Sequence, residues 1–347
     1  MAMPFGDFDA RSAGMGSVGV ATSSLASAAF YNPAMLNHQE EASDFELFIV
    51  AGVRGSDTDR LLDDIDDFNV AVDAVNDVEA RRLFEQSLGK SVALSAHAGA
   101  SFGINAESFN FALIGQRYVH AALRTTGPVT NPSLDAIGID ITEVGLATSF
   151  GLGDFSIGLT PKSQAVTTYD YNNKSIINID TDYQDIFDEA GERDHGSNLN
   201  LDLGVVYKIS DASFAGLTVR NLSSQTFTTA RGRTIELEPQ ARFGLGYRND
   251  YFRIGIDVDV TENKAIAFED KTQYAAIGME LNGWDWLQLR LGYRDNIAAD
   301  AKSDKLMTVG LGIRLFGSVG IDLAAQANET NTDANEVGGY ATVVASF

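Results

Sequence analysis

The sequence predicts an all-β protein: a 14-stranded antiparallel transmembrane β-barrel with an N-terminal plug and a helical insertion in its first outer loop. Three observations predict this fold: period-two alternation in roughly fourteen segments, alternation of short and long connections, and a chain that ends on Phe347. Side chains of a strand point alternately to its two faces, so such segments have one apolar and one polar face. In a membrane barrel the apolar faces contact lipid and the polar faces line the lumen.

The segment FRIGIDVDV, Phe252 to Val260, shows the alternation most clearly. We expect Asp257 and Asp259 to point into the lumen, where basic side chains on neighbouring strands can pair with them. Two roles are open for such inward charges: a ladder that fills the barrel, or a device for ion selectivity. Other inward candidates on nearby strands are Arg242, Arg290, Arg294, Arg314, Asp202, Glu280 and Asp322.

The connections between these segments alternate strictly in length. Short connections such as GLGD (151–154) and NGWD (282–285) alternate with long polar ones such as residues 124–135 and 172–197. This pattern is typical of an up-and-down barrel with short periplasmic turns and long outer loops, whereas a soluble Greek-key sandwich would mix the lengths. Trp284 and Trp286, in a short turn, fit an aromatic girdle at the periplasmic interface.

Composition excludes several classes of function. The 347 residues carry 25 Lys and Arg against 48 Asp and Glu, a net charge of −23, so the basic surface that nucleic acid requires is absent. There is no cysteine, and no apolar run is long enough for a transmembrane helix. The start MAMPFGDFDA looks like a mature terminus, so we expect an exported protein of the Gram-negative outer membrane whose signal peptide is removed or absent.

The sequence shows no enzymatic motif. The histidines, His38, His97, His120 and His195, are scattered, and no GxSxG, HExxH or phosphate-binding loop is present. Ser95 and His97 share one strand face, but this pairing is common by chance. We therefore expect neither catalysis nor a cofactor or metal.

Residues 57–91 interrupt the strand pattern on the outer side. Leu61, Ile65, Phe68, Val72 and Val75 recur at helical spacing and predict an amphipathic pair of helices. The stripe covers neighbouring loops or forms a lid over a binding site. The Asp residues at 63, 64, 66 and 67, together with 180–189, could hold calcium between lipopolysaccharide phosphates, although the features of an EF-hand are missing and a solvated acidic surface is the alternative.

Residues 1–42 precede the first strand and are expected to form a periplasmic plug inside the barrel, with residues 43–347 forming the barrel itself. The segment is rich in glycine and small residues, which allow close backbone approach in a crowded lumen. Its content of Phe, Tyr and Met is too apolar for the alternative, a disordered tail.

Part of this N-terminal segment is similar in sequence to a known protein family. The stretch SAGMGSVGVATSSLASAAFYNPAML (12–36) resembles the N-terminal hatch of the FadL-type outer-membrane transporters of long-chain fatty acids and hydrocarbons. It is more similar to the TraF-like conjugal-transfer group of that superfamily, as are residues 157–171 and 238–259. The family also has fourteen strands. The matching hatch positions are Gly14, Gly16, Gly19, Asn32, Pro33 and Ala34.

The resemblance implies a route in which a hydrophobic ligand passes an apolar pocket beside the hatch and leaves sideways through an inward bend of strand three. By position this strand is 108–124, and the lateral opening would involve Gly115, Arg117 and Tyr118. A charge facing lipid near mid-bilayer costs roughly 2–4 kcal/mol, which favours a bulge or kink near Gly115 to Arg117. The alternative is that Arg117 lies near the interface and snorkels. The outer helices at 57–91 differ from the family pattern.

The sequence thus predicts passive outer-membrane transport of hydrophobic, fatty-acid-like or hydrocarbon-like molecules through a hatch-gated barrel. A structural or shuttle role in a secretion or conjugation system is the alternative, and a general porin is disfavoured because the hatch should block water. The expected partners are outer-membrane lipid and lipopolysaccharide, a hydrophobic ligand and possible secretion or conjugation components, but no nucleic acid. The expected ligand-binding residues are Phe5, Phe8, Phe30, Tyr31, Met35 and Leu36.

Overall fold

The protein forms a closed antiparallel barrel of fourteen strands, as the sequence predicts. The computed structural model describes residues 5–39, 44–57, 60–106, 109–128, 133–175, 193–264, 270–284, 286–299, 305–315, 318–328 and 335–347. Consecutive barrel strands pair with each other, and β7 pairs with β10 because β8 and β9 form a separate hairpin. The barrel strands are β1 (Phe45–Asp57), β2 (Ser91–Ala106), β3 (Phe109–Thr126), β4 (Ser133–Leu152), β5 (Phe155–Ser175), β6 (Arg193–Lys208), β7 (Ser213–Arg220), β10 (Gln240–Arg248), β11 (Phe252–Asp259), β12 (Tyr274–Trp284), β13 (Leu287–Asn296), β14 (Leu306–Leu315), β15 (Val319–Asn328) and β16 (Asn335–Ser346).

The first and last strands close the barrel. β1 and β16 pair from Glu46↔Ser346 to Asp57↔Asn335. At the end of this seam the Phe347 amide donates to the Phe45 carbonyl at 2.9 Å, and the Phe45 amide donates to the Phe347 carbonyl at 3.0 Å. The C-terminal residue therefore completes the strand ladder and leaves no open edge there.

The two faces of the wall have opposite polarity. Outward positions carry exposed apolar side chains, among them Ile49, Leu113 and Leu291, whereas Asp257, Asp259 and Arg290 are buried inside. Trp284 and Trp286 are exposed at the short-turn end, where an aromatic girdle would lie. The inward orientation predicted for Asp257 and Asp259 is confirmed.

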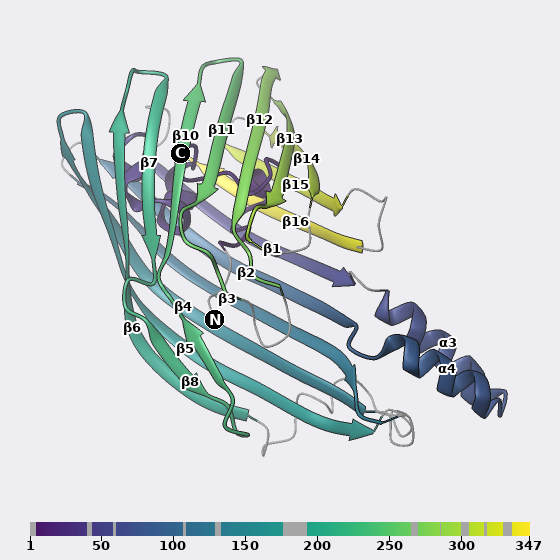
Figure 1. Cartoon of the computed structure of the whole chain (residues 1–347). Helices are drawn as coiled ribbons and strands as arrows, with labels where there is room; N and C mark the ends of the chain where they lie inside the picture. Colours follow the sequence, from purple (N-terminus) through teal and green to yellow (C-terminus); the bar gives the residue numbers. More distant parts are fainter. Residues whose placement is uncertain are drawn as a thin grey trace.

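The wall is uneven in height (Figure 1). β2 to β6 have 16 to 21 residues, whereas most strands from β7 to β15 have 8 to 11. The hairpin of β8 (Gln225–Thr228) and β9 (Thr234–Leu237) contributes Ile235 and Leu237 to an apolar cluster with isoleucines of β4. This hairpin therefore covers apolar surface of the taller part of the wall.

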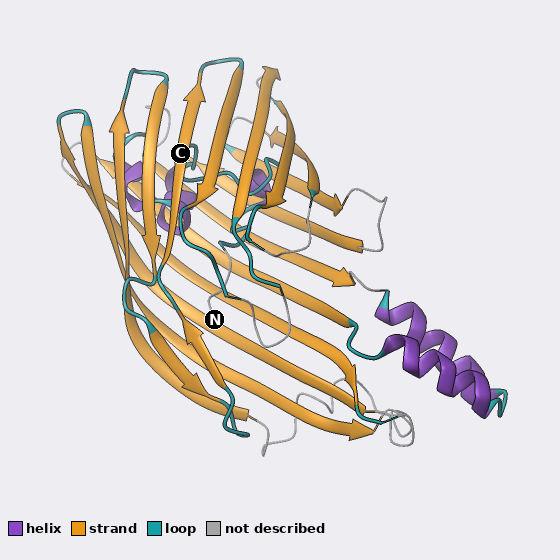
Figure 2. Ribbon diagram, in the orientation of Figure 1, coloured by secondary structure: helices purple, strands orange, loops and turns teal. Residues whose placement is uncertain are grey.

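The insertion after β1 is a pair of helices, α3 (Leu61–Asp73) and α4 (Asp77–Ser87), that projects from one end of the barrel (Figure 2). Lys90 at its base pairs with Asp64 at 2.7 Å. The predicted apolar stripe is only partly correct: Leu61 and Phe68 are buried, but Val72 and Val75 are exposed. Ala71, Ala80, Leu83 and Phe84 pack with Phe68 instead, because the two helices bury their facing sides against each other. No helix in the described part of the chain has the length and hydropathy to cross a membrane.

Candidate functional site: the hatch segment inside the barrel

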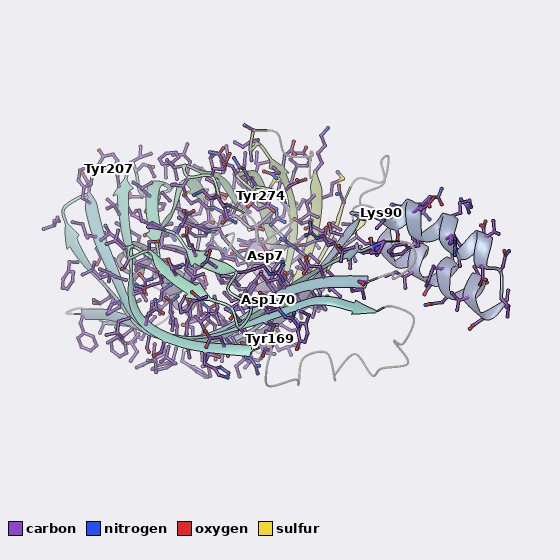
Figure 3. All side chains as sticks on the ribbon, turned by 60° about the horizontal axis from the view of Figure 1, so that its bottom comes forward. Asp7, Lys90, Tyr169, Asp170, Tyr207 and Tyr274 are labelled. Carbon is purple, nitrogen blue, oxygen red and sulfur yellow. The ribbon has the colours of Figure 1, made fainter. Side chains whose placement is uncertain are left out.

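Residues 5–38, here called the hatch segment, lie in the lumen. Figure 3 shows Asp7 between the barrel walls, with Tyr207 and Lys90 toward opposite ends. The segment contains three short helices, α1 (Ala10–Ala13), α2 (Leu25–Tyr31) and η1 (Pro33–Asn37). Nearly all of its residues are buried, and they contact several barrel strands.

The triplet Asn32-Pro33-Ala34 joins the hatch segment to the wall. The Asn32 side chain accepts a hydrogen bond from the Ala34 amide at 3.1 Å and so caps η1. Its Nδ2 donates to the Val20 carbonyl at 3.1 Å and to the Val205 carbonyl of β6 at 3.3 Å. Pro33 occupies the first turn of η1, where its lack of an amide hydrogen has no cost.

The three hatch glycines occupy crowded positions. A Cβ on Gly14 would lie 2.8 Å from Cα of Gly310, and one on Gly19 would lie 2.3 Å from the Tyr31 ring. Gly16 has a φ of +72° and donates its amide hydrogen to Thr308 Oγ1 at 2.9 Å. These contacts give the sequence motif a physical reason: close approach at all three positions and a left-handed backbone at Gly16.

The wall supplies matching glycines that the sequence analysis missed. A Cβ on Gly278 would lie 2.1 Å from the Met15 carbonyl oxygen, and one on Gly292 would lie 2.1 Å from the Gly16 nitrogen. Gly278 pairs with both Gly255 and Gly292 across the sheet. The sequence could have indicated these glycines, because they alternate with the apolar residues of their strands and therefore lie on the inward, polar face.

Ionic contacts also fix the hatch segment. Arg11 binds Glu280 of β12 at 2.8 Å, and Asp257 of β11 accepts from the Gly19 and Val20 amides at 2.8 and 3.1 Å. Burial opposes ionisation of Asp7, but Arg294 and hydrogen bonds from Ser17 and Gln326 outweigh it and lower the pKa of the carboxyl. Asp7 therefore remains charged at neutral pH and holds the segment to β13 and β15.

The predicted ligand-binding residues come together in one cluster. Phe8 stacks on Phe30 at 5.6 Å between ring centroids, and Tyr31 meets Phe8 edge-on at 5.1 Å. The guanidinium carbons of Arg220 and Arg242 lie 4.4 Å from the ring centroids of Phe8 and Phe5, respectively. Phe5, Phe8, Phe30, Tyr31, Met35 and Leu36 are each at most 3% exposed, and wall residues such as Phe48, Ile114, Val206 and Phe214 complete the cluster.

Little open space adjoins the Phe5 and Phe8 side of this cluster. A void of about 20 Å³ lies between Phe5 and Phe8 of the hatch segment and Ser95, His97 and Tyr118 of the wall. On the outer face, an apolar depression of about 760 Å³ is lined by β1, β2, β3, β15 and β16 residues including Ala98 and Arg117. The void and the depression share Gly52, Ala96, His97 and Tyr340 and lie on opposite sides of the same part of the wall.

The bulge or kink expected near Gly115 to Arg117 is absent. β3 pairs with β2 and β4 in continuous register through these residues. Arg117 has a side chain 63% exposed and pairs with Asp140 of β4 at 2.6 Å, so its charge is balanced without bending the strand. Tyr118 points to the lumen instead, where its hydroxyl donates to Ser95 Oγ at 3.3 Å.

Ser95 does not pair with His97: its Oγ lies 2.8 Å from Nδ1 of His120, whereas His97 hydrogen-bonds Gln116. Within the described residues, no group of His, Asp or Glu side chains could hold a metal ion. Residues 180–189, the second acidic stretch, lie outside the described residues.

The fold and the filled lumen define an outer-membrane β-barrel with an internal hatch. Residues 29–259 match the family described as "F plasmid transfer operon, TraF, protein". The chain belongs to this family. A search of curated proteins finds no match.

Solved structures of similar fold include two toluene transporters and a FadL homologue. The Ralstonia pickettii toluene transporter TbuX is 11% identical, with a TM-score of 0.62 over 99% of each chain. A Pseudomonas aeruginosa FadL homologue is 12% identical, with a TM-score of 0.60 over 98% of each chain. The Pseudomonas putida toluene transporter TodX is 13% identical, with a TM-score of 0.56 over 97% of this chain and 96% of that one.

Proposed function

We propose that the protein is a passive outer-membrane channel for hydrophobic small molecules and that the hatch segment gates it. The observation that carries this proposal is the cluster around Phe8, Phe30 and Tyr31, which places buried aromatic surface in the lumen beside charged residues such as Arg220 and Arg242. The similar structures, named as toluene transporters and a FadL homologue, agree with such a cargo.

Transport requires the hatch segment to move or repack. The void beside Phe5 and Phe8, about 20 Å³, is smaller than one benzene ring needs, since a cavity of roughly 150 Å³ holds benzene. The contacts of Asp7, Arg11 and Gly19 with the wall are individually breakable, each worth about 1–3 kcal/mol. The described arrangement is therefore the closed state of the proposed gate.

A lateral exit is proposed where Arg117 and Tyr118 flank the wall from opposite sides. Arg117 lines the outer depression and Tyr118 lines the inner void. Hydrogen-bonded strands β1 and β2 separate the two spaces, so this exit requires local opening of their pairing. Gly115 lines neither space.

A second function, a structural part of a transfer apparatus, is favoured by two observations: the family description and the close packing of the hatch segment. In that case the hatch segment never leaves the lumen. Cells that lack the protein would lose hydrocarbon uptake if it is a channel, and conjugal transfer if it is a structural component.

The test compares cells with intact lipopolysaccharide that express the protein with cells that lack it, using uptake of radiolabelled toluene and the frequency of conjugal transfer. The channel predicts uptake several-fold above the cells that lack the protein and unchanged transfer. Uptake at background level, together with a fall in transfer, would establish the structural role instead.

A further inference from the structure

A second cavity lies between the hatch segment and the short-turn ends of the barrel strands, and its chemistry differs from that of the aromatic cluster. Its volume is about 190 Å³. Asp9, Arg11 and Ser23 line it from the hatch segment, and Arg248, Arg253 and Arg314 from the wall. Leu25, Phe48 and Val344 give it one apolar side.

A ladder of ion pairs ends at this cavity on both sides. Arg11 binds Glu280 at 2.8 Å and Glu280 binds Arg290 at 2.7 Å. Arg290 binds Asp322 at 2.7 Å, and Asp322 binds Arg314 at 3.1 Å. Three guanidiniums alternate with two carboxylates, so the ladder carries one excess positive charge, and both terminal guanidiniums line the cavity.

The other charged groups of the lining have contacts within the protein. Arg253 donates to the Thr22 carbonyl at 3.2 Å, and Arg248 donates to the His38 carbonyl at 2.7 Å. Of the remaining acids, Glu46 accepts from Ser24 Oγ and the Ala26 amide, and Asp9 accepts from the Ser12 amide. The lining thus combines four guanidiniums with three carboxylates, and Oε1 of Glu46 and Oδ1 of Asp9 accept hydrogen bonds from the hatch segment.

Ser23 supplies a second, independent observation. It is 3% exposed, and its hydroxyl has no hydrogen-bond partner among the described residues. A buried hydroxyl without a partner costs free energy, so its presence at the edge of a polar cavity points to an acceptor that fills the cavity.

We infer that this cavity binds a small oxyanion, a carboxylate or phosphate group, that accepts a hydrogen bond from Ser23 and is held by the guanidiniums of Arg11, Arg253 and Arg314. Planar guanidiniums suit both kinds of anion because they present paired donors. The anion is either a free ion or the head of an amphiphile whose chain lies toward Leu25 and Val344. The inference of an anion site does not depend on the proposed transport of hydrocarbons and can be tested separately.

The test is isothermal titration of the purified full-length protein in a neutral detergent with two probes, inorganic phosphate and sodium octanoate. Ser23→Ala removes the hydroxyl without breaking any hydrogen bond described in the protein. It should weaken probe binding about tenfold, the equivalent of one hydrogen bond to a charged acceptor. Arg314→Gln removes the excess charge of the ladder and should weaken binding at least as much.

Ser101→Ala is the matched control. Ser101 is 2% exposed, and its hydroxyl is likewise without a partner in the described structure, but it stands on β2 outside this cavity. This variant should bind both probes like the wild type. Thermal unfolding of all three variants checks that each is folded.

The two probes separate the sources of the anion. Phosphate binding that Ser23→Ala weakens identifies a free oxyanion site, and octanoate binding alone identifies the head-group site of an amphiphile. The inference is overturned if neither probe binds, or if Ser23→Ala and Arg314→Gln bind as tightly as Ser101→Ala.

Discussion

Arg11 of the hatch segment binds Glu280 of β12 through two hydrogen bonds, from Nε to Oε2 at 2.8 Å and from Nη2 to Oε1 at 2.9 Å. The contact joins positions 269 residues apart and ties the first helix of the segment to the middle of the wall. Because Glu280 also binds Arg290, breaking the contact frees the hatch segment without leaving the carboxylate unpaired. This pair is therefore a latch whose removal should loosen the segment and spare the barrel.

Arg11→Gln should raise hydrogen–deuterium exchange of residues 10–23 about tenfold or more. The expected loss is about 1–3 kcal/mol of local stability, the range for a charged hydrogen-bonded contact that is partly buried. Arg60→Gln is the control, since Arg60 pairs with Asp63 on the exposed helix α3. Equal exchange in both variants would show that the latch does not hold the segment.

Gly278→Ala should displace the hatch segment from the wall. The added Cβ would lie 2.1 Å from the Met15 carbonyl oxygen, and backbone on both sides leaves little room for adjustment. Overpacking of this kind costs about 1–3 kcal/mol. The expected result is faster trypsin cleavage after Arg11, while the barrel strands stay resistant.

Gly283→Ala on the same strand is the comparison, because a Cβ there meets nothing within 4 Å. If Gly278→Ala and Gly283→Ala were cleaved at the same rate, the close contact between Met15 and the wall would have no role in seating the segment.

Acidification should destabilise the end of the hatch segment at His38. Burial, followed by the charges of Arg248 and Lys208, lowers the pKa of His38 from 6.5 to about 4. The folded state favours the neutral imidazole, so the contribution to stability is complete above pH 6.5 and declines as the pH falls from 6.5 toward 4. Thermal unfolding between pH 4 and 8 should show this slope in the wild type and a flatter one in His38→Asn.

The exposed His195 provides the control for that experiment. His195→Asn should keep the wild-type slope. A slope that persisted in His38→Asn would assign the pH dependence to another group.

Phe8→Ala should enlarge the void beside the aromatic cluster into a site for a small aromatic molecule. Phe8 contacts Phe30, Tyr31 and His97, and its removal leaves those rings and the Arg220 guanidinium around a space that fits an aromatic ring. Truncation of a buried Phe costs about 3–5 kcal/mol, part of which a bound hydrocarbon can restore. Toluene should therefore raise the unfolding temperature of Phe8→Ala more than that of the wild type.

Phe109→Ala serves as its control, since Phe109 is exposed on the outer face. If toluene raised the unfolding temperature of Phe8→Ala and Phe109→Ala equally, toluene would be acting on the detergent-covered outer surface and not at the aromatic cluster.

The strands and their inward charges were predictable because period-two alternation is a local property of the sequence. Asp257 and Arg290 could be assigned to the lumen because each alternates with apolar residues along its strand. The partner of Arg117 could not, because Asp140 lies 23 residues further on and reaches it only through the register of β3 and β4. Without that partner, a kink near Gly115 to Arg117 and a snorkelling Arg117 were the two alternatives.

The packing of α3 against α4 could not be predicted from the sequence either. Val72 continues the helical spacing of Phe68, yet the turn before Asp77 brings Ala80 and Phe84 to the facing side instead. For the site, the hatch glycines and aromatic residues were visible in the sequence. The role of the wall glycines Gly278 and Gly292 could not be predicted, because it depends on the backbone of Met15, which only the structure places beside them.

The central claim, that the hatch segment must move for a hydrophobic molecule to pass, can be tested with a reversible lock. The Ala10 amide donates to Thr342 Oγ1 of β16 at 2.9 Å, so residues 10 and 342 are neighbours. The lock is the double variant Ala10→Cys, Thr342→Cys, in a chain that has no other cysteine, once its two thiols are shown to oxidise to a disulfide. The measurement is toluene uptake by cells with intact lipopolysaccharide, before and after reduction, with each single variant as control. We predict background uptake in the oxidised double variant and recovery on reduction, whereas equal uptake in both states would contradict the account.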